Sequence, residues 1–236
     1  MDIMQNYLKG LKDGIPIGLG YISVSFTFGL IATSKGFYWW QALLISMLVL
    51  TSAGQFSAID VMLTPGRFVE LIISQITINI RYSFMSISLS QKVDEKFGKI
   101  FRLLYGFFIT DEIFAVASMK KEVTRSYFGG LSTMPWIGWT AGTLLGAIAG
   151  NVLPASIITA LGITIYAMFI AIITPGIIED MKVAITVFIS VLLSLFFYYV
   201  PVVNTVPVGF SISICAVVAA LVGALILPVS EVNEDE

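Results

Sequence analysis

Eight long apolar stretches constrain this chain more than any other feature, because a helix needs about 20 apolar residues to cross the core of a bilayer. The stretches are Ile15–Ala32, Trp39–Ile59, Phe68–Leu89, Leu103–Met119, Trp136–Leu153, Ile157–Ile173, Val183–Val200 and Val206–Leu227. Of the 236 residues, 57% are apolar and 12% are charged, and this charged share is about half that of a soluble domain. We therefore predict an all-α polytopic membrane protein, a single integral membrane domain over residues 1–236.

The counts of histidine and cysteine exclude several kinds of site. The chain has no histidine, which excludes imidazole metal sites and both Ser-His-Asp and Cys-His triads. Its one cysteine, Cys215, cannot form an internal disulfide or a thiolate zinc site. No basic stripe suggests nucleic acid. We expect no metal, no cofactor, no nucleic-acid partner and no catalysis of bond chemistry.

The positions of lysine and arginine set the predicted topology, because these residues concentrate in cytoplasmic loops. Two long charged loops, Gln91–Arg102 and Lys120–Thr133, share one side only if the stretch Leu103–Met119 enters the membrane and returns. That stretch has Thr110-Asp111-Glu112 at its middle. We predict about seven transmembrane helices plus one irregular or re-entrant segment, with the N-terminus outside and both loops in the cytoplasm. Eight full spans are the alternative.

An internal duplication would relate residues 10–119 to residues 133–227. Gly54 and Pro175-Gly176 interrupt apolar stretches about 121 positions apart, and the starts of other stretches repeat at a similar offset. Repeat halves with matching Gly- or Pro-interrupted helices are typical of transporters. Chance offsets, which any polytopic protein can show, are the alternative.

Glycines at every fourth position occur in two stretches. In the fifth stretch they are Gly138, Gly142, Gly146 and Gly150, and near the first they include Gly14 and Gly18. Such spacing removes side chains from one helix face and lets a second helix approach closely. We predict that these residues form helix-packing surfaces rather than a ligand site.

A polar stripe runs along the third stretch. Gln75, Asn79, Ser83, Ser86 and Ser90 recur every three or four residues, so they share one helix face. Facing lipid, this stripe would leave its amides and hydroxyls unsatisfied. It must face protein or a water-filled cavity, and hydrogen bonding between helices is the simpler of these two explanations.

Arg81 lies near the middle of the same stretch, where a guanidinium costs several kcal/mol unless it is paired or hydrated. The candidate partners are Asp60, Asp111 and Glu112. One arginine cannot neutralise three carboxylates at once. A buried carboxylic acid without a full counter-charge favours its protonated form. The group could therefore couple transport to protons, with a purely structural ion pair as the alternative.

The second stretch is predicted to contain a broken helix at Gly54-Gln55, because small and polar residues gather there. Backbone N–H groups freed at a break can bind a carboxylate at the positive end of a helix. Pro175-Gly176 would supply the matching break in the second half. We expect a substrate site between the two breaks, beside Asn79.

At these residues the chain resembles the AzlC family of branched-chain amino acid permeases. The matching elements are Gly14-x-x-x-Gly18, Ser52-Ala53-Gly54-Gln55-Phe56, Asn79-Ile80-Arg81-Tyr82-Ser83-Phe84-Met85 and Thr110-Asp111-Glu112. The resemblance runs from about Gly10 to Leu227. Family members often carry histidine where this chain has Tyr82, which weakens any histidine-based coupling scheme.

The resemblance implies a secondary transporter in the cell membrane of a prokaryote that exports branched-chain and similar apolar amino acids. It also implies a complex with a small membrane subunit of the AzlD type. The residues alone indicate a polar site within the membrane for a small zwitterion or ion. An ion or small-solute channel, and a membrane-embedded enzyme or assembly subunit, remain the alternatives.

Overall fold

The computed structural model describes residues 3–94, 97–150, 154, 156, 170, 173–174 and 176–226. In this part the chain is helical apart from its connections, with one isolated β-bridge between Val93 and Val123. The prediction of an all-α protein is confirmed for these residues. Almost all of the predicted stretch Ile157–Ile173, together with Pro175, lies outside the described residues.

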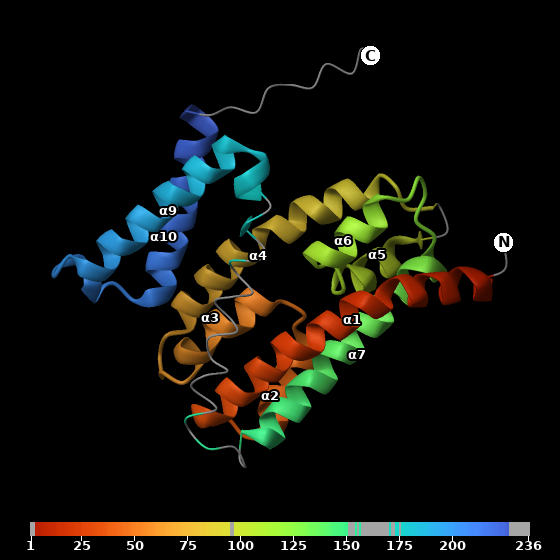
Figure 1. Cartoon of the computed structure of the whole chain (residues 1–236), viewed down its shortest axis with the longest axis horizontal. Helices are drawn as coiled ribbons and strands as arrows, with labels where there is room; N and C mark the ends of the chain where they lie inside the picture. Colours follow the sequence, from red (N-terminus) through yellow and green to blue (C-terminus); the bar gives the residue numbers. More distant parts are fainter. Residues whose placement is uncertain are drawn as a thin grey trace. The chain divides into compact units, whose positions relative to one another are not determined.

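The helices shown in Figure 1 form two compact units. Unit 1 contains residues 1–59 and 79–166, and unit 2 contains residues 60–78 and 167–236. The helices are α1 (Ile3–Ser34), α2 (Trp39–Leu48), α3 (Ser52–Met62), α4 (Phe68–Ser90), α5 (Lys99–Gly106), α6 (Asp111–Ser118), α7 (Arg125–Ala149), α9 (Met181–Tyr199) and α10 (Val208–Ile226). A single integral domain and a relation between halves 10–119 and 133–227 both stay predictions.

Helices α1 and α7 pack in parallel along their whole lengths, and glycines make this approach possible. A Cβ atom on Gly14 would meet the backbone of Leu131, and one on Gly146 would meet the backbone of Phe26. Gly18, Gly138, Gly142 and Gly150 likewise face the opposite helix. The close contact lets the two helices form one rod that supports the rest of unit 1.

Helix α7 begins earlier than the predicted stretch at Trp136. It starts at Arg125, where the Thr124 side chain accepts a hydrogen bond from the Tyr127 backbone N–H at 3.3 Å. Phe128 and Leu131 are fully buried. The C-terminal part of the predicted loop Lys120–Thr133 is therefore helical, because its apolar face packs on α1.

The two charged loops lie side by side. The backbone N–H of Val123 donates to Lys92 O at 2.7 Å, and that of Asp94 donates to Val123 O at 3.1 Å. The chain between these loops leaves them and returns as α5 and α6, with a break at residues 107–110. The predicted irregular segment Leu103–Met119 is thus a helical hairpin, and both loops lie on one side.

The second stretch is also a hairpin, which corrects its prediction as a spanning segment. Helices α2 and α3 are separated at residues 49–51. Ile59 of α3 packs in one buried cluster with Ala42 near the start of α2 and with Ala32 and Ala147 near the ends of α1 and α7. Helix α3 therefore runs back to the end of unit 1 at which α2 begins. The α2–α3 hairpin thus enters unit 1 from the end opposite the charged loops.

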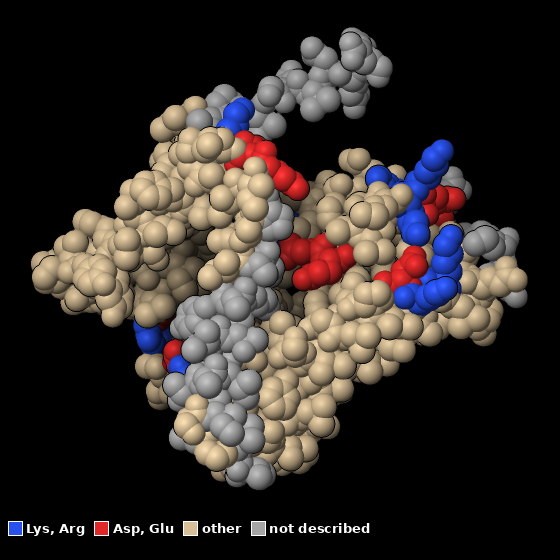
Figure 2. Space-filling model, in the orientation of Figure 1, with Lys and Arg blue, Asp and Glu red and all other residues tan. Residues whose placement is uncertain are grey.

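The start of α1 lies beside the charged loops, so the prediction of an outside N-terminus is wrong for this arrangement. Asp13 forms an ion pair with Lys120 at 3.2 Å and accepts a hydrogen bond from Tyr127 at 2.7 Å. Figure 2 shows basic side chains gathered at the end of the unit where α1 begins, while the flank of α1 and α7 is almost uncharged. From the positive-inside rule we predict that this end faces the cytoplasm.

Three described helices are long enough and apolar enough to cross a bilayer, namely α1, α9 and α10. Helices α4 and α7 contain 23 and 25 residues, or about 35 Å each at 1.5 Å per residue. These lengths also match a bilayer core. The described part of the chain therefore combines long helices with two shorter, broken hairpins.

Unit 2 contains the first half of α4 and the hairpin of α9 and α10. Glu70 of α4 is 2% exposed, and its carboxylate accepts a hydrogen bond from the Gly209 backbone N–H at 2.7 Å. Arg67 pairs with the same carboxylate at 2.5 Å. Glu70 therefore caps the N-terminus of α10 and fixes α10 against α4.

Single cysteines introduced at Lys12 and Lys121 should be labelled from the cytoplasmic side only, and one at Lys35 from the outside only. The reason is that α1 places Lys35 at the end opposite the Asp13–Lys120 pair. Labelling with a membrane-impermeant thiol reagent in cells and in inverted vesicles measures this, in a Cys215→Ala background. If Lys12 and Lys121 label from opposite sides, the arrangement is wrong.

Candidate functional site

The tips of the two hairpins of unit 1 meet at the middle of α4. Tyr82 of α4 donates a hydrogen bond to Thr51, which lies at the α2–α3 tip, at 3.4 Å. Arg81 of α4 binds Asp111, which begins α6 at the other tip, at 2.7 Å. Because the hairpins enter from opposite ends of the unit, their meeting point lies between those two ends. This places the polar residues of three separate segments in one cluster.

The break in the second stretch lies at Val49–Thr51 rather than at Gly54-Gln55, which are inside the first turn of α3. Gln55 is buried, and its amide donates hydrogen bonds to Val49 O at 2.6 Å and Ile45 O at 3.2 Å. These carbonyls belong to the end of α2, where the helical ladder stops. Gln55 thus holds the hairpin tip together instead of facing a substrate.

Asn79 is joined directly to this tip. The Thr51 hydroxyl donates to the Asn79 side-chain oxygen at 2.7 Å. The same hydroxyl oxygen lies 3.4 Å from the Gly54 backbone N–H and so caps α3. A change in the position of the α2–α3 tip would therefore alter this hydrogen bond to Asn79.

Arg81 forms an ion pair with Asp111, one of its three predicted partners. Its guanidinium binds the Asp111 carboxylate, and its second terminal nitrogen lies 3.2 Å from the Tyr82 hydroxyl. The side chains of Arg81 and Asp111 are 39% and 32% exposed, so the pair borders an open space. Asp60 is exposed near the end of α3 and belongs to unit 2.

Glu112 has a different environment from its neighbour Asp111. Its carboxylate accepts a hydrogen bond from the Tyr21 hydroxyl of α1 at 2.5 Å. The same hydroxyl lies 2.7 Å from the side-chain oxygen of Thr110, the residue that caps α6. The ring of Tyr21 packs edge-on against Trp139 of α7, with 5.3 Å between ring centres.

Trp139 connects this group to the other hairpin. Its indole N–H donates to the Gln55 side-chain oxygen at 3.1 Å. Sequence reasoning missed Tyr21, Thr51 and Trp139, because aromatic residues and threonine in an apolar stretch look like ordinary core residues. The one available signal was a tyrosine hydroxyl deep in an apolar stretch, where it needs a partner.

The electrostatic field of the helix dipoles at the two hairpin tips favours anions. Helices α3 and α6 both begin at the cluster, so their positive ends point there. Asp111 and Glu112 occupy the first turn of α6, where negative charge is stabilised. In the described part of the chain, no group of three acidic, cysteine or histidine side chains could hold a metal ion.

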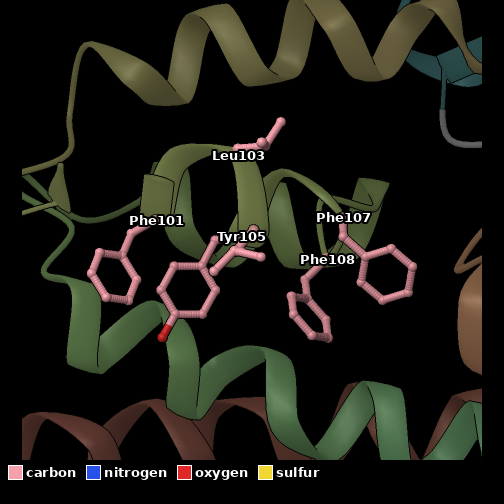
Figure 3. Close-up of a pocket in the computed structure, with 6 residues that line it drawn as sticks. Phe101, Leu103, Tyr105, Phe107 and Phe108 are labelled. Atoms are coloured by element: carbon pink, nitrogen blue, oxygen red, sulfur yellow. The ribbon is translucent and has the colours of Figure 1, made fainter. Parts of the chain in front are cut away.

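The remaining predicted substrate residues are Pro175 and Gly176, and one groove of unit 1 lies outside the cluster. Gly176 is helical and belongs to unit 2, and its neighbour Pro175 is outside the described residues. A groove of about 580 Å³ lies along α5. Figure 3 shows Phe101 and Tyr105 of α5, and Phe108 just after it, pointing toward α7 while Leu103 points away. The lining of the groove is apolar apart from the Tyr105 hydroxyl and contains no charged side chain.

The similarity of this chain to known proteins extends over the region that contains the cluster. The family model described as AzlC protein matches residues 16–153. An uncharacterized membrane protein of Archaeoglobus fulgidus is 34% identical over 72% of this chain and 75% of its own length. The inner membrane protein YgaZ of Escherichia coli is 32% identical over 70% and 71%, respectively. An uncharacterized membrane protein of Helicobacter pylori J99 is 27% identical over 63% and 68%. No solved structure matches.

Proposed function

Because this chain belongs to the AzlC family of membrane proteins, we propose that it is a secondary transporter that exports branched-chain and similar apolar amino acids. One structural observation carries the proposal: two opposed hairpins meet at a polar cluster midway along α4. Broken helices whose ends face a site at mid-membrane are characteristic of secondary transporters. The substrate class follows from the family resemblance.

An amino acid zwitterion needs donors for its carboxylate, acceptors for its ammonium group and apolar space for its side chain. The N–H groups at the start of α3 and the amide of Asn79 supply donors near the α2–α3 tip. The Asp111 carboxylate and the Thr51 hydroxyl supply acceptors. Ile80, exposed on α4 between Asn79 and Arg81, supplies apolar surface. The substrate would bind between the tips.

Alternating access would follow if one hairpin tip moved away from α4 while the other stayed in place. The α1–α7 rod, packed backbone to backbone, would serve as the fixed part. Proton uptake by a carboxylate of the Thr110-Asp111-Glu112 element would couple this motion to the proton gradient. In this proposal Gly54 and Gln55 support the α2–α3 tip, and Asn79 contacts the substrate.

The family resemblance also supports a partner, a small membrane subunit of the AzlD type, and a location in the cell membrane of a prokaryote. Many large apolar side chains of the described helices are exposed, including Phe188 and Leu192 of α9. Such surfaces suit lipid or another membrane helix. Co-purification with the subunit is the direct check of this part of the proposal.

An Asn79→Ala variant should slow leucine efflux about tenfold or more while folding nearly as well as the wild type. The substitution removes a substrate contact and the acceptor for Thr51, whose hydroxyl keeps Tyr82 as a partner; loss of one neutral hydrogen bond costs about 1 kcal/mol of stability. Ser83→Ala, on the same helix with an exposed side chain, is the matched control and should transport normally. Normal rate and affinity in Asn79→Ala would place the site elsewhere.

A further inference from the structure

Two carboxylates stand side by side at the start of α6, but only one has a cation. Asp111 binds Arg81 at 2.7 Å. Glu112 is bound by the Tyr21 hydroxyl, which is neutral. The groups that face Glu112 are Tyr21 from α1, Thr110 and Asp111 from α6 and, through Asp111, Arg81 from α4. Among the residues that the structure describes, Asp111 therefore has a cation bound directly to it and Glu112 does not.

Tyr21 lies within bonding distance of two acceptors but has one hydrogen to donate. The Glu112 carboxylate is 2.5 Å away and the Thr110 hydroxyl oxygen is 2.7 Å away. While Glu112 is charged, the carboxylate is the stronger acceptor and takes this hydrogen bond. Thr110 then serves only as the cap of α6, accepting from the Ile113 backbone N–H at 3.4 Å.

From this geometry we propose that Tyr21 is the positioning residue that transmits protonation of Glu112 to the hairpin tips. The inference rests on the proposed transport function and names Glu112 as the group that carries the proton. When Glu112 binds a proton from water, its new O–H donates to the Tyr21 oxygen. The Tyr21 O–H then turns to the Thr110 side-chain oxygen. No covalent bond changes except the one that binds the proton.

Two consequences reach the hairpins. At the α5–α6 tip, neutral Glu112 no longer interacts with the positive end of α6, and the cap oxygen of Thr110 gains a second donor. At the α2–α3 tip, the effect passes through the ring of Trp139, which touches Tyr21 and donates to Gln55. Gln55 holds the carbonyl of Val49 at that tip. A single proton bound by Glu112 therefore acts on both hairpin tips.

The test compares Tyr21→Phe with a matched control, Tyr127→Phe. Both variants keep an aromatic ring and lose one hydroxyl bonded to a carboxylate, but Tyr127 bonds Asp13 at the cytoplasmic end of the α1–α7 rod. Infrared difference spectra of the purified protein report the Glu112 carboxyl as the signal that is absent from Glu112→Gln. Tyr21→Phe removes the hydroxyl that donates to this carboxyl. The infrared band of Glu112 should therefore move in Tyr21→Phe and stay unchanged in Tyr127→Phe.

The pH profile of leucine efflux should change in Tyr21→Phe and keep its wild-type form in Tyr127→Phe. In a Glu112→Gln background, Tyr21→Phe should have no further effect on the profile. An unchanged Glu112 band in Tyr21→Phe, or an equal change in Tyr127→Phe, overturns this inference even if the wild type transports. If the band moves as expected but the wild type moves no amino acid, the proposed function fails and the Tyr21–Glu112 link stands.

Discussion

A Gly142→Leu variant should lose the native packing of unit 1, with the melting temperature lowered on the order of 10 °C or no folded protein recovered. A Cβ at this position would lie 2.5 Å from Ile22 O and 2.9 Å from the Ile22 Cα, and would overlap the Ser25 hydroxyl. Backbone atoms of a packed helix cannot move aside as a flexible side chain can. Thermal unfolding of the purified protein, followed by its far-UV circular dichroism, measures the effect.

Gly20→Leu is the matched control for this substitution. Gly20 lies in α1, yet no atom outside its own helical turn is within 4 Å of its Cβ position. The same change of residue should therefore leave the melting temperature within a few degrees of the wild type. Equal behaviour of the two variants would show that the glycine contacts do not hold α1 against α7.

A Glu112→Gln variant should lose export against a substrate gradient by at least about tenfold, while exchange of internal for external leucine continues. Glutamine imitates a permanently protonated glutamate, so the proton cannot be released and net transport stops. The glutamine amide N–H can donate to the Tyr21 oxygen as a protonated glutamate would, so the contact with Tyr21 is kept. Proteoliposomes with and without an imposed pH gradient separate net export from exchange.

Asp111→Asn is the informative comparison for this variant. It leaves Arg81 without its 2.7 Å ion pair and removes one proposed acceptor for the substrate ammonium group. Both stability and substrate affinity should therefore fall, and the loss of stability should be small because both side chains are partly exposed. If Glu112→Gln still drives uphill export with the pH dependence of the wild type, coupling does not run through Glu112. The Asp111–Arg81 pair would then be the next candidate.

Much of the fold followed from patterns of residue type that reflect local physics. The glycines around Gly142 predicted a close helix contact, because spacing alone determines which residues share a face. Arg81 predicted an acidic partner, since an unpaired guanidinium is costly in a membrane. Loop charge and the acidic residues at 111–112 predicted the irregular segment that the structure shows as the α5–α6 hairpin.

The α2–α3 hairpin was not predicted, for a physical reason. Its apolar length equals that of one spanning helix, and hydropathy does not distinguish a helix that crosses from two shorter ones that fold back. The return is seen in the buried cluster that Ile59 shares with Ala42, Ala32 and Ala147. The role of Tyr21 was hidden for a similar reason, because its partners Thr110 and Glu112 come from a segment about 90 positions away.

The measurement that tests the central claim most directly is efflux of labelled leucine, isoleucine, valine and methionine from proteoliposomes containing the purified chain. Vesicles with and without a co-reconstituted small AzlD-type subunit are compared, each at several internal concentrations. We predict saturable efflux that depends on the pH gradient and is reduced at least about tenfold by Asn79→Ala. Efflux that is absent for all four amino acids under both conditions, or that rises linearly with concentration without a gradient, would contradict the account.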